Sequence, residues 1–511
     1  MGLFALLSES RWYLVATVII FYVSRKYRQY NRLKAFKGPF GTGFSELWHS
    51  RAILGMETHL RYAEVCEKYG PIARIGPNDL MTSSPELVSR MSAARSPYTR
   101  AAWFYGALSF EPGKDHVFSE LDEKRHARKR QQMAAGYSGK DNPSLEPSID
   151  NRVQELLDLI RTKYLSSNKS FKPMDLARKI QYFTLDVISD IGFGTPFGNL
   201  AADEDVNKYI QSNEQGLRVM VAIFAFGITK LSKLPPLAQL LGPSEKDGYG
   251  FGKMIATAKQ YIEKRLASGA QGRHDMIASF VKHGMTKDEL LTEGVLQVMA
   301  GSDTTATAVR TTMLCLMTHP SSYWALRAEI DATVNSGKVP ASPGIIPDSV
   351  ARNLKYLQAV IKEGIRVHPT ITEIMPKTVP PEGDTFELDG KQIFLPGGAN
   401  IGYCAWGIHR NKDIFGEDAE IFRPERWLDE INEEQLNRMQ RTFDLMFGFG
   451  KYQCLGKNIA MIELSKLVFE FFRNFDMEIV NPEKPWTSTN TLGVFLQEDM
   501  WVRVTERTTI P

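Results

Sequence analysis

A glycine-rich loop that contains one cysteine and leads directly into an amphipathic helix constrains this chain more than any other feature. The loop reads FGFGKYQCLG over residues 447–456, and its key positions are Phe447, Gly450, Cys454 and Gly456. Glycines permit positive φ and close approach of the backbone to a bulky ligand. A cysteine at a helix N-terminus meets free amide donors and the positive end of the helix dipole, which stabilise a thiolate. The loop therefore predicts a thiolate ligand, although a buried structural role is the commonest one for a free cysteine.

A long helix is expected from about Thr286 to Thr318. Thr286 and Glu289 have the spacing of a capping box, and His319-Pro320 ends the pattern. The middle of the helix, LQVMAGSDTTATAV, is rich in residues with low helix propensity, so tertiary contacts must hold it. Three- and four-residue spacing predicts one small, flat face that suits a planar group, made of Gln297, Ala300, Gly301, Thr304 and Ala308.

Composition and periodicity predict one mainly α domain with a minor β part. Helical periodicity covers residues 150–165, 174–191, 252–266 and 455–474, and Asp389-Gly390 marks a tight hairpin. The net charge of +3 excludes nucleic acid as an expected partner. The four cysteines, which are far apart, indicate no disulfide framework. We expect an anchor at residues 1–24, a basic and Gly/Pro-containing linker at 25–45 and a single catalytic domain at 46–511.

The N-terminal segment has the features of a single-pass transmembrane helix. Trp12 to Val23 is apolar apart from Thr17, and a helix over residues 3–23 is about 30 Å long, enough to cross a bilayer core. A cleaved signal peptide is the alternative interpretation. By the positive-inside rule, the basic flank after the apolar run stays in the cytosol, and it contains Arg25, Lys26, Arg28, Arg32, Lys34 and Lys37.

The cysteine loop resembles the haem-binding loop of the cytochromes P-450. The resemblance extends over essentially the whole chain and is closest to fungal microsomal members of the pisatin-demethylase-like kind, through KYQCLGK and AGSDTTATA. It implies haem b as cofactor, Cys454 as the axial iron ligand, and the endoplasmic reticulum membrane as location, with the catalytic domain facing the cytosol. Further segments carry it in the expected order: TLDVISDIGFG (184–194), AGSDTT (300–305), KEGIR (362–366) and FRPERW (422–427).

The resemblance assigns roles to residues around the haem. Asp303 and Thr304 form the acid–alcohol pair that passes protons towards bound dioxygen, next to Ala300 and Gly301 on the haem-facing helix. A structural cluster beneath the haem consists of Glu363, Arg366 and Arg426. The cofactor-binding set is completed by Phe447 of the loop and by the residues expected at the haem propionates, which are Arg130, His126, Lys377 and Tyr452.

At the propionates this chain departs from the family pattern. His126 replaces the tryptophan of the WxxxR segment, whereas Arg130 keeps its arginine. Tyr452 replaces an arginine and supplies a hydrogen bond without a charge, so the adjacent Lys451 is considered as a substitute. Lys377 stands where an arginine is common.

The function implied is that of an NADPH-dependent monooxygenase acting on an apolar small molecule by hydroxylation, epoxidation or oxidative dealkylation. Electrons would come from NADPH through a cytochrome P-450 reductase, with cytochrome b5 as a further candidate donor. A solvated helix face is the alternative interpretation of the basic run proposed as the docking site, which contains Lys124, Arg125, Arg128 and Lys129. A haem-thiolate isomerase or dehydratase and a haem-based sensor remain alternatives, but neither accounts for the acid–alcohol pair.

The substrate pocket is expected, by resemblance, to be lined by five segments. One of them contains Glu373, an acid that would either orient a nitrogen or hydroxyl of the substrate or turn to solvent. The segments are 98–118, 212–250, Val298 to Thr304, Thr370 to Ile374 and Leu492 to Phe495. Most of these residues are apolar, as in other buried ligand sites.

Overall fold

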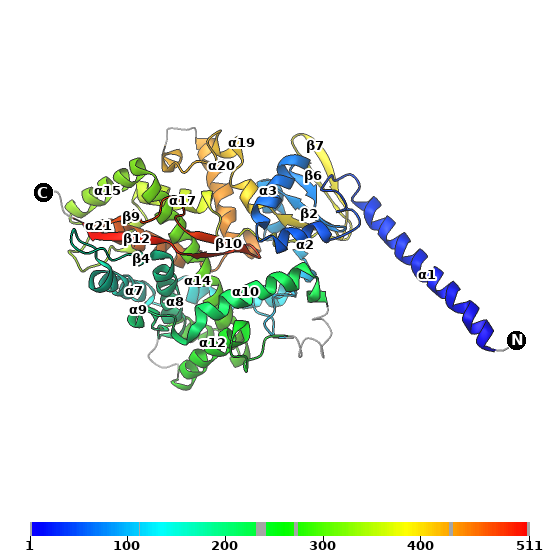
Figure 1. The fold of residues 1–511 in the computed structure, drawn as a ribbon, viewed down its shortest axis with the longest axis horizontal. Coiled ribbons are helices and arrows are strands. Elements are labelled where there is room, and N and C mark those ends of the chain that lie inside the picture. Colours follow the sequence, from blue (N-terminus) through cyan, green and yellow to red (C-terminus); the bar gives the residue numbers. More distant parts are fainter. Residues whose placement is uncertain (1–2, 112, 231–241, 270–273, 429–432, 508–511) are drawn as a thin grey trace.

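A computed structural model describes residues 3–111, 113–230, 242–269, 274–428 and 433–507. Helices dominate it, as the sequence predicts, and they pack around one long helix that crosses the body (Figure 1). The longer helices of the body are α6 (Glu123–Tyr137), α7 (Leu145–Leu159), α8 (Leu176–Phe193), α10 (Tyr209–Ala225), α12 (Gly250–Ala267), α14 (Lys287–Thr318), α15 (Pro320–Asn335), α17 (Lys355–Val367), α20 (Glu433–Asp444) and α21 (Lys457–Asn474). Shorter ones are α2 (Leu47–Leu54), α3 (Thr58–Tyr69), α4 (Pro85–Ser92), α5 (Ala102–Tyr105), α9 (Asn199–Ala202), α13 (Met276–Lys282), α16 (Asp348–Ala351), α18 (Ala405–Ile408) and α19 (Lys412–Phe415).

The β part is small and divided among several sheets. A five-stranded sheet has the order β1-β2-β8-β5-β3, and a three-stranded sheet has the order β4-β12-β9. The hairpin predicted at Asp389-Gly390 is confirmed, because both residues have positive φ (51° and 72°) between two antiparallel strands. The strands are β1 (Ile72–Arg74), β2 (Asp79–Thr82), β3 (Thr99–Arg100), β4 (Met174–Asp175), β5 (Lys377–Thr378), β6 (Asp384–Leu388), β7 (Lys391–Leu395), β8 (Asn400–Tyr403), β9 (Phe475–Ile479), β10 (Thr487–Thr491), β11 (Val494–Glu498) and β12 (Trp501–Glu506).

Helix α14 forms the centre of the main apolar core. Its predicted start is confirmed, since Thr286 and Glu289 make both hydrogen bonds of a capping box. Threonine hydroxyls in its interior donate to the carbonyl four residues back, as Thr304 does to Ala300 (2.7 Å) and Thr312 does to Ala308 (2.8 Å). These bonds satisfy hydroxyls that would otherwise disfavour a helix interior. Helix α14 packs against α8, α12, α17 and α21. These contacts keep its middle helical although its residues have low helix propensity.

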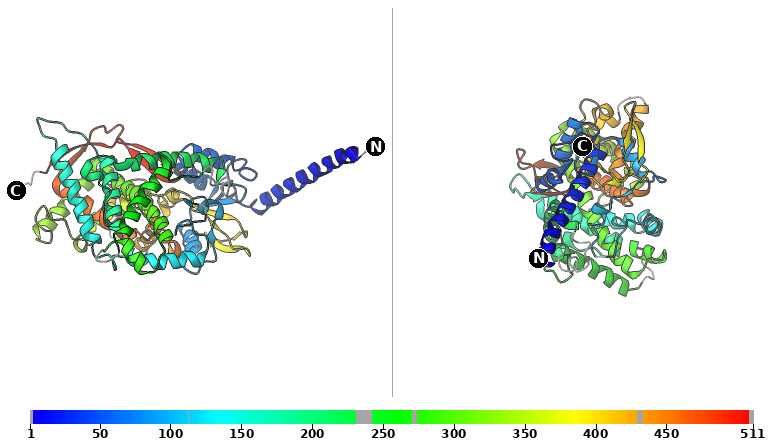
Figure 2. Two further views of the ribbon diagram at one scale, coloured as in Figure 1. Left: turned by 90° about the horizontal axis from the view of Figure 1, so that it is seen from below. Right: turned by 90° about the vertical axis from the view of Figure 1, so that its right-hand side faces the viewer.

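Helix α1 (Leu3–Arg32) projects from the end of the body that carries β2, β6 and β7 (Figure 1, and Figure 2, left). It continues past residue 24, so part of the expected linker is helical. Its last turn is fixed to the body by Arg74, which donates to the carbonyl oxygens of Tyr30 (3.1 Å) and Gln29 (3.2 Å). Within the part of the chain that the structure describes, no helix has both the length and the apolar character needed to cross a membrane.

Candidate active site

The cysteine loop is a sharply bent segment between α20 and α21. Gly448 and Gly450 have φ of 68° and 56°, in the region that favours glycine. A Cβ on Gly450 would lie 2.2 Å from the carbonyl oxygen of Ser92, so only glycine lets the loop approach α4 this closely. The loop is closed by the amide of Cys454, which donates to the carbonyl of Phe447 at 2.6 Å. The predicted need for glycine is therefore confirmed at position 450.

The thiol of Cys454 lies at the N-terminal end of α21. Burial raises its pKa, but the backbone amides of Gly456 and Lys457 and the charge of Arg130 all act in the opposite direction. Although atoms of the protein surround the thiol, the residue keeps a solvent-accessible side. The amides and Arg130 favour a negative charge on the sulfur, which is the requirement for a metal-binding thiolate.

The predicted flat face of α14 is only partly correct. Ala300 is exposed and Thr304 is half-buried, so the middle of the helix keeps an accessible surface at these two positions. Gln297 and Ala308, in contrast, are buried in the protein. Gly301 faces α8, because a Cβ there would lie 2.9 Å from the side chain of Ile188. Gly301 therefore has a role in helix packing, and its role next to a cofactor stays a prediction.

Asp303 and Thr304 are adjacent in sequence, but their side chains make separate contacts. Gln181 of α8 donates to Asp303 Oδ1 and Asn213 of α10 donates to Asp303 Oδ2, both at 2.7 Å. Burial raises the pKa of Asp303, while Asn213, Gln181 and the nearby charge of Arg310 limit the rise. The acid is thus held between three helices. A proton passing from it to Thr304 needs a side-chain rotation or a water molecule.

Buried and half-buried cations gather around Tyr452 of the cysteine loop, since Arg100 and Lys377 lie 4.7 Å and 4.3 Å from the centroid of its ring and Arg130 lies near Arg100 and Cys454. Arg100 and Lys377 are buried, and Arg130 is half-buried. Arg100 donates to backbone carbonyls and Lys377 to the hydroxyl of Tyr105 (2.7 Å), while Arg100 Nε has no partner among the described residues. Burial lowers the pKa of Lys377, and Arg100 adds to the effect. Among the described residues none of the three cations has a carboxylate partner within ion-pair distance, which is unfavourable unless an anion binds there.

The other predicted propionate residues have different roles. Tyr452 donates its hydroxyl to Glu123 (2.5 Å), so this hydrogen bond is already used within the protein. Lys451 pairs with the same Glu123 (3.1 Å) and donates to two backbone carbonyls, which is evidence against its substitution for the missing arginine. His126 Nε2 accepts a hydrogen bond from Arg100 (3.1 Å), and burial lowers the pKa of His126 to about 3, so the ring is neutral. Sequence reasoning missed Arg100, because a single arginine before a short helix has no distinctive pattern.

The three residues predicted to form a structural cluster meet as expected. Glu363 Oε1 lies 2.7 Å from Arg366 and 2.7 Å from Arg426, and all three side chains are almost fully buried. Burial favours the protonated acid, but the two arginines keep the pKa of Glu363 below its ordinary value. Trp427 and the backbone amide of Arg423 also donate to the carboxylate, which satisfies its remaining lone pairs.

Segments predicted to line the pocket come together in one apolar cluster. Phe104, Leu108 and Phe118 of the first segment pack with Phe224 of α10 and with Leu492. The predicted range 212–250 includes residues 231–241, which lie outside the described residues, as does residue 112. Glu373 is 5% exposed, so the interpretation that it turns to solvent is wrong. Burial raises its pKa to about 7, and its Oε2 has no partner among the described residues.

The comparisons with known proteins agree with this geometry. The family model for cytochrome P450 matches residues 39–500. The chain belongs to the cytochrome P450 family. Similar proteins include cytochrome P450 monooxygenase ABA1 of Pyricularia oryzae (40% identical, covering 94% of this chain and 93% of that protein). Others are cytochrome P450 monooxygenase aba1 of Botryotinia fuckeliana (37%, 91% and 90%) and cytochrome P450 monooxygenase abl1 of Leptosphaeria maculans (33%, 94% and 85%).

The residues of this cytochrome P450 fit a haem held by a thiolate. Cys454 offers a sulfur with amide donors directed at it, and Arg100, Arg130 and Lys377 form an anion site that suits propionates. Haem bound in this way supplies the chemistry of dioxygen activation, because thiolate donation favours cleavage of the O–O bond. The protein is therefore a haem-thiolate oxidoreductase of the monooxygenase class.

Proposed function

We propose that this cytochrome P450 inserts one atom of dioxygen into an apolar small molecule, by hydroxylation, epoxidation or oxidative dealkylation. The observation that carries the proposal is the cysteine at the N-terminal end of α21, with amides directed at its sulfur and an anion site beside it. The apolar cluster formed by Phe104, Phe118, Phe224 and Leu492 supports an apolar substrate. Because the similar fungal proteins are named monooxygenases, we further propose a role in fungal secondary metabolism or detoxification.

The experiment that tests the proposal is the absorption spectrum of the reduced, carbon-monoxide-bound protein, compared with that of Cys454→Ala. A strongly red-shifted Soret band that disappears in the variant is expected. A band typical of histidine-ligated haem in the wild-type protein would contradict the ligand assignment. Incorporation of one atom from labelled dioxygen into product separates a monooxygenase from a haem-thiolate isomerase or dehydratase, which incorporates none.

Thr304 and Asp303 are the residues we assign to proton delivery. The Thr304 hydroxyl lies on the accessible part of α14, where it can donate to an oxygen atom of the reactant when it leaves the Ala300 carbonyl. Burial raises the pKa of Asp303, so this carboxyl accepts and releases a proton closer to neutral pH than an ordinary aspartate does. Gln181 and Asn213 hold it in place, which sets the starting point of the proton path.

Electrons reach this protein, in our proposal, from NADPH through a reductase, with cytochrome b5 as a second donor. The proposed docking face is narrower than the basic run of α6. Lys124 is exposed, and Arg125 and Arg128 keep 64% and 58% of their side-chain surface although they pair with acids. Lys129 is excluded from this face because it is buried. An exposed basic face should steer an acidic partner, and its effect should weaken with salt.

Attachment to the endoplasmic reticulum membrane through α1, with the catalytic domain in the cytosol, is also a proposal. What supports it is the exposed apolar run from Trp12 to Val23, followed by basic residues without acids up to Lys37. Removal of residues 1–24 should shift the protein from the membrane fraction to the supernatant. A single variant, Ile20→Lys, should do so partly, whereas Tyr249→Lys, an exposed site elsewhere, should not. Membrane association that persists after the deletion would contradict α1 as the anchor.

A further inference from the structure

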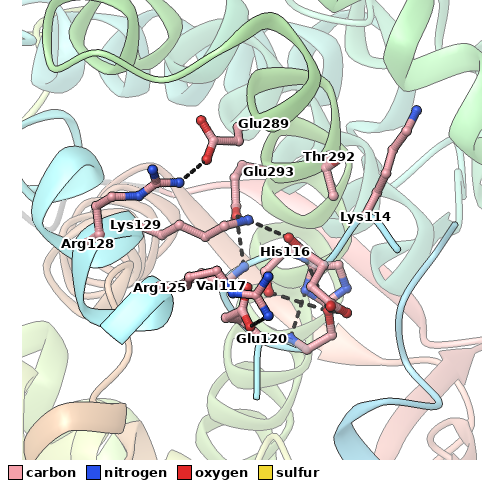
Figure 3. A network of polar contacts seen from close by, with 12 residues as sticks. Lys114, His116, Val117, Glu120, Arg125, Arg128, Lys129, Glu289, Thr292 and Glu293 are labelled. Atoms are coloured by element: carbon pink, nitrogen blue, oxygen red, sulfur yellow. Dashed lines mark hydrogen bonds and ion pairs between the residues drawn. The ribbon is translucent and has the colours of Figure 1, made fainter. Parts of the chain in front are cut away.

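A buried ion pair between α6 and α14 lies outside the residues that handle protons or bind the haem. Lys129 Nζ is 3.1 Å from Glu293 Oε1, and the two side chains are only 6% and 1% exposed. Figure 3 shows the pair at the centre of a polar network between the two helices and a neighbouring loop. A buried pair is costly unless further hydrogen bonds compensate its charges. Here the bonds to Glu293 go to Oε1, while Oε2 has no partner among the described residues. The groups that supply those bonds therefore indicate its role.

Both members of the pair hold the backbone of the turn formed by residues 115–120. Glu293 Oε1 accepts from the amide of Val117 at 2.8 Å, and Lys129 Nζ donates to the carbonyl of Asp115. The turn is closed internally, since the amide of Glu120 donates to the carbonyl of His116 (2.9 Å). Its position on α14 is consequently set by one buried carboxylate and one buried ammonium group.

The opposite side of the same turn is held by Arg100. Its guanidinium donates to the carbonyls of Val117 (2.8 Å) and Glu120 (3.0 Å). Val117 thus has its amide bound to α14 and its carbonyl bound to a residue of the anion site. The next residue, Phe118, lies 5.4 Å from Tyr105 between ring centroids and packs against the apolar cluster with Phe224.

We propose that Lys129 and Glu293 form a positioning clamp: together they fix the 115–120 turn, so that Phe118 completes the apolar wall of the substrate pocket and Arg100 stays directed at the haem edge. The inference rests on the proposed function, because a pocket wall matters only when haem and a ligand occupy the site. It also gives Lys129 a role in ligand binding instead of in electron transfer.

The clamp can be tested without knowledge of the substrate, by using two nitrogenous ligands of the haem iron. Imidazole is small and needs little of the pocket, whereas 4-phenylimidazole places a ring against its apolar wall. Difference spectra of the full-length protein give both dissociation constants. In Lys129→Met and Glu293→Ala we expect binding of 4-phenylimidazole to weaken by about tenfold, corresponding to about 1.4 kcal/mol. The dissociation constant of imidazole should change less than about twofold, because this ligand needs little of the pocket wall.

Glu293→Gln and Arg128→Gln are the matched controls. The glutamine keeps an acceptor for Val117 and Lys129, so it should recover most of the affinity for 4-phenylimidazole. Arg128 is the next residue on α6 and also pairs with α14, through Glu289, but it is exposed. Its variant should leave both ligands unaffected, and should instead raise the reductase concentration needed for half-maximal reduction.

The double variant Lys129→Met/Glu293→Leu serves if a single variant fails to fold, because it removes both charges together. It should retain the red-shifted carbon-monoxide band and still lose affinity for 4-phenylimidazole only. Wild-type affinity in the double variant, or parallel weakening of both ligands, would overturn the clamp. Failure of the proposed function would look different: the wild-type protein itself would lack the red-shifted band.

Discussion

The indole nitrogen of Trp427 donates to Glu363 Oε2 at 2.9 Å, and this bond connects the buried charge cluster to the cysteine loop. Trp427 lies against Phe443 (5.7 Å between ring centroids), and Phe443 lies against Phe447 (6.2 Å). The carbonyl of Phe447 then accepts from the amide of Cys454. A continuous series of contacts through two aromatic rings therefore connects the cluster to the loop that carries Cys454.

Trp427→Phe should destabilise the protein by about 1–3 kcal/mol, because it removes a hydrogen bond to a buried, charged carboxylate oxygen, leaving Arg366 Nε as the other donor to that atom. Urea unfolding followed by tryptophan fluorescence and by the Soret band measures the change. The control is Trp324→Phe, at a tryptophan that is 59% exposed, where the loss should stay within about 0.5 kcal/mol. Equal effects of the two substitutions would contradict the connection from Glu363 to the loop.

Gly450→Ala should greatly reduce the amount of haem-loaded protein. The new methyl group would lie 2.2 Å from the Ser92 carbonyl, and φ of 56° would add a cost of about 1–2 kcal/mol for a residue with a side chain. Haem content per folded protein is the measurement. Gly248→Ala is the comparison, since no atom lies within 4 Å of the position of its Cβ. A normally loaded Gly450→Ala protein would show that the loop can move away from α4.

Arg100→Met should speed the loss of haem by about tenfold, equivalent to about 1.4 kcal/mol of binding, because a cation of the anion site is removed. Transfer of haem to an excess of apomyoglobin gives the rate. Lys451→Met should have a smaller effect, since Lys451 is already bound to Glu123 and to two carbonyls. Faster haem loss from Lys451→Met than from Arg100→Met would instead indicate that Lys451 replaces the missing arginine.

Asp303→Asn should lower turnover by about 10²–10⁴-fold, the usual range for loss of a positioned acid or base, without removing the red-shifted carbon-monoxide band. Product formation from a fluorogenic alkoxycoumarin and hydrogen peroxide release per NADPH are the measurements, and peroxide is expected to rise. Asn213→Leu removes one donor to the carboxylate but keeps the acid, so its effect should be smaller. Unchanged turnover in Asp303→Asn would remove this residue from the proton path.

The pH dependence of stability should contain a contribution from Glu293. Burial raises its pKa to about 7, opposed mainly by Lys129, while Glu289 on the same helix adds to the rise. Because the native state binds this proton more tightly than the unfolded chain does, the contribution is fully present below the unfolded value near 4.5 and is lost as pH rises through about 7. Urea unfolding at pH 5.5, 6.5, 7.5 and 8.5 should show a decline of about 2–3 kcal/mol that is absent in Glu293→Gln. The same dependence of the unfolding free energy on pH in the wild-type protein and in Glu293→Gln would contradict this contribution of Glu293.

Features that depend on neighbouring residues were predictable from the sequence. The capping box at Thr286, the hairpin at Asp389-Gly390 and the glycines of the cysteine loop are local, and each is confirmed. The α14 face was predicted less well, because spacing alone does not say which neighbour a face contacts. The spacing of the residues places Gly301 on the same face as Thr304, but in the structure Gly301 packs against Ile188 of α8.

The polar contacts of the site depend on residues far apart in the chain, which no local pattern reveals. Arg100 meets His126 and lies beside Lys377 only after the sheet and α6 have packed. Lys129 was grouped with exposed basic residues because it stands in a charge run. A signal was nevertheless present: the buried side of α6 repeats at three- and four-residue intervals, through His126, Lys129, Met133 and Gly136.

The hydrogen bonds from Arg74 to the last turn of α1 set the angle between this helix and the body of the protein. Arg74 also donates to the carbonyls of Gly76 (3.0 Å) and Pro77 (2.7 Å), so it links the last turn of α1 to the loop between β1 and β2. Any surface that takes up the apolar part of α1 would consequently dictate the tilt of the whole body and the direction in which its pocket opens. Replacing Arg74 should therefore alter orientation before it alters chemistry.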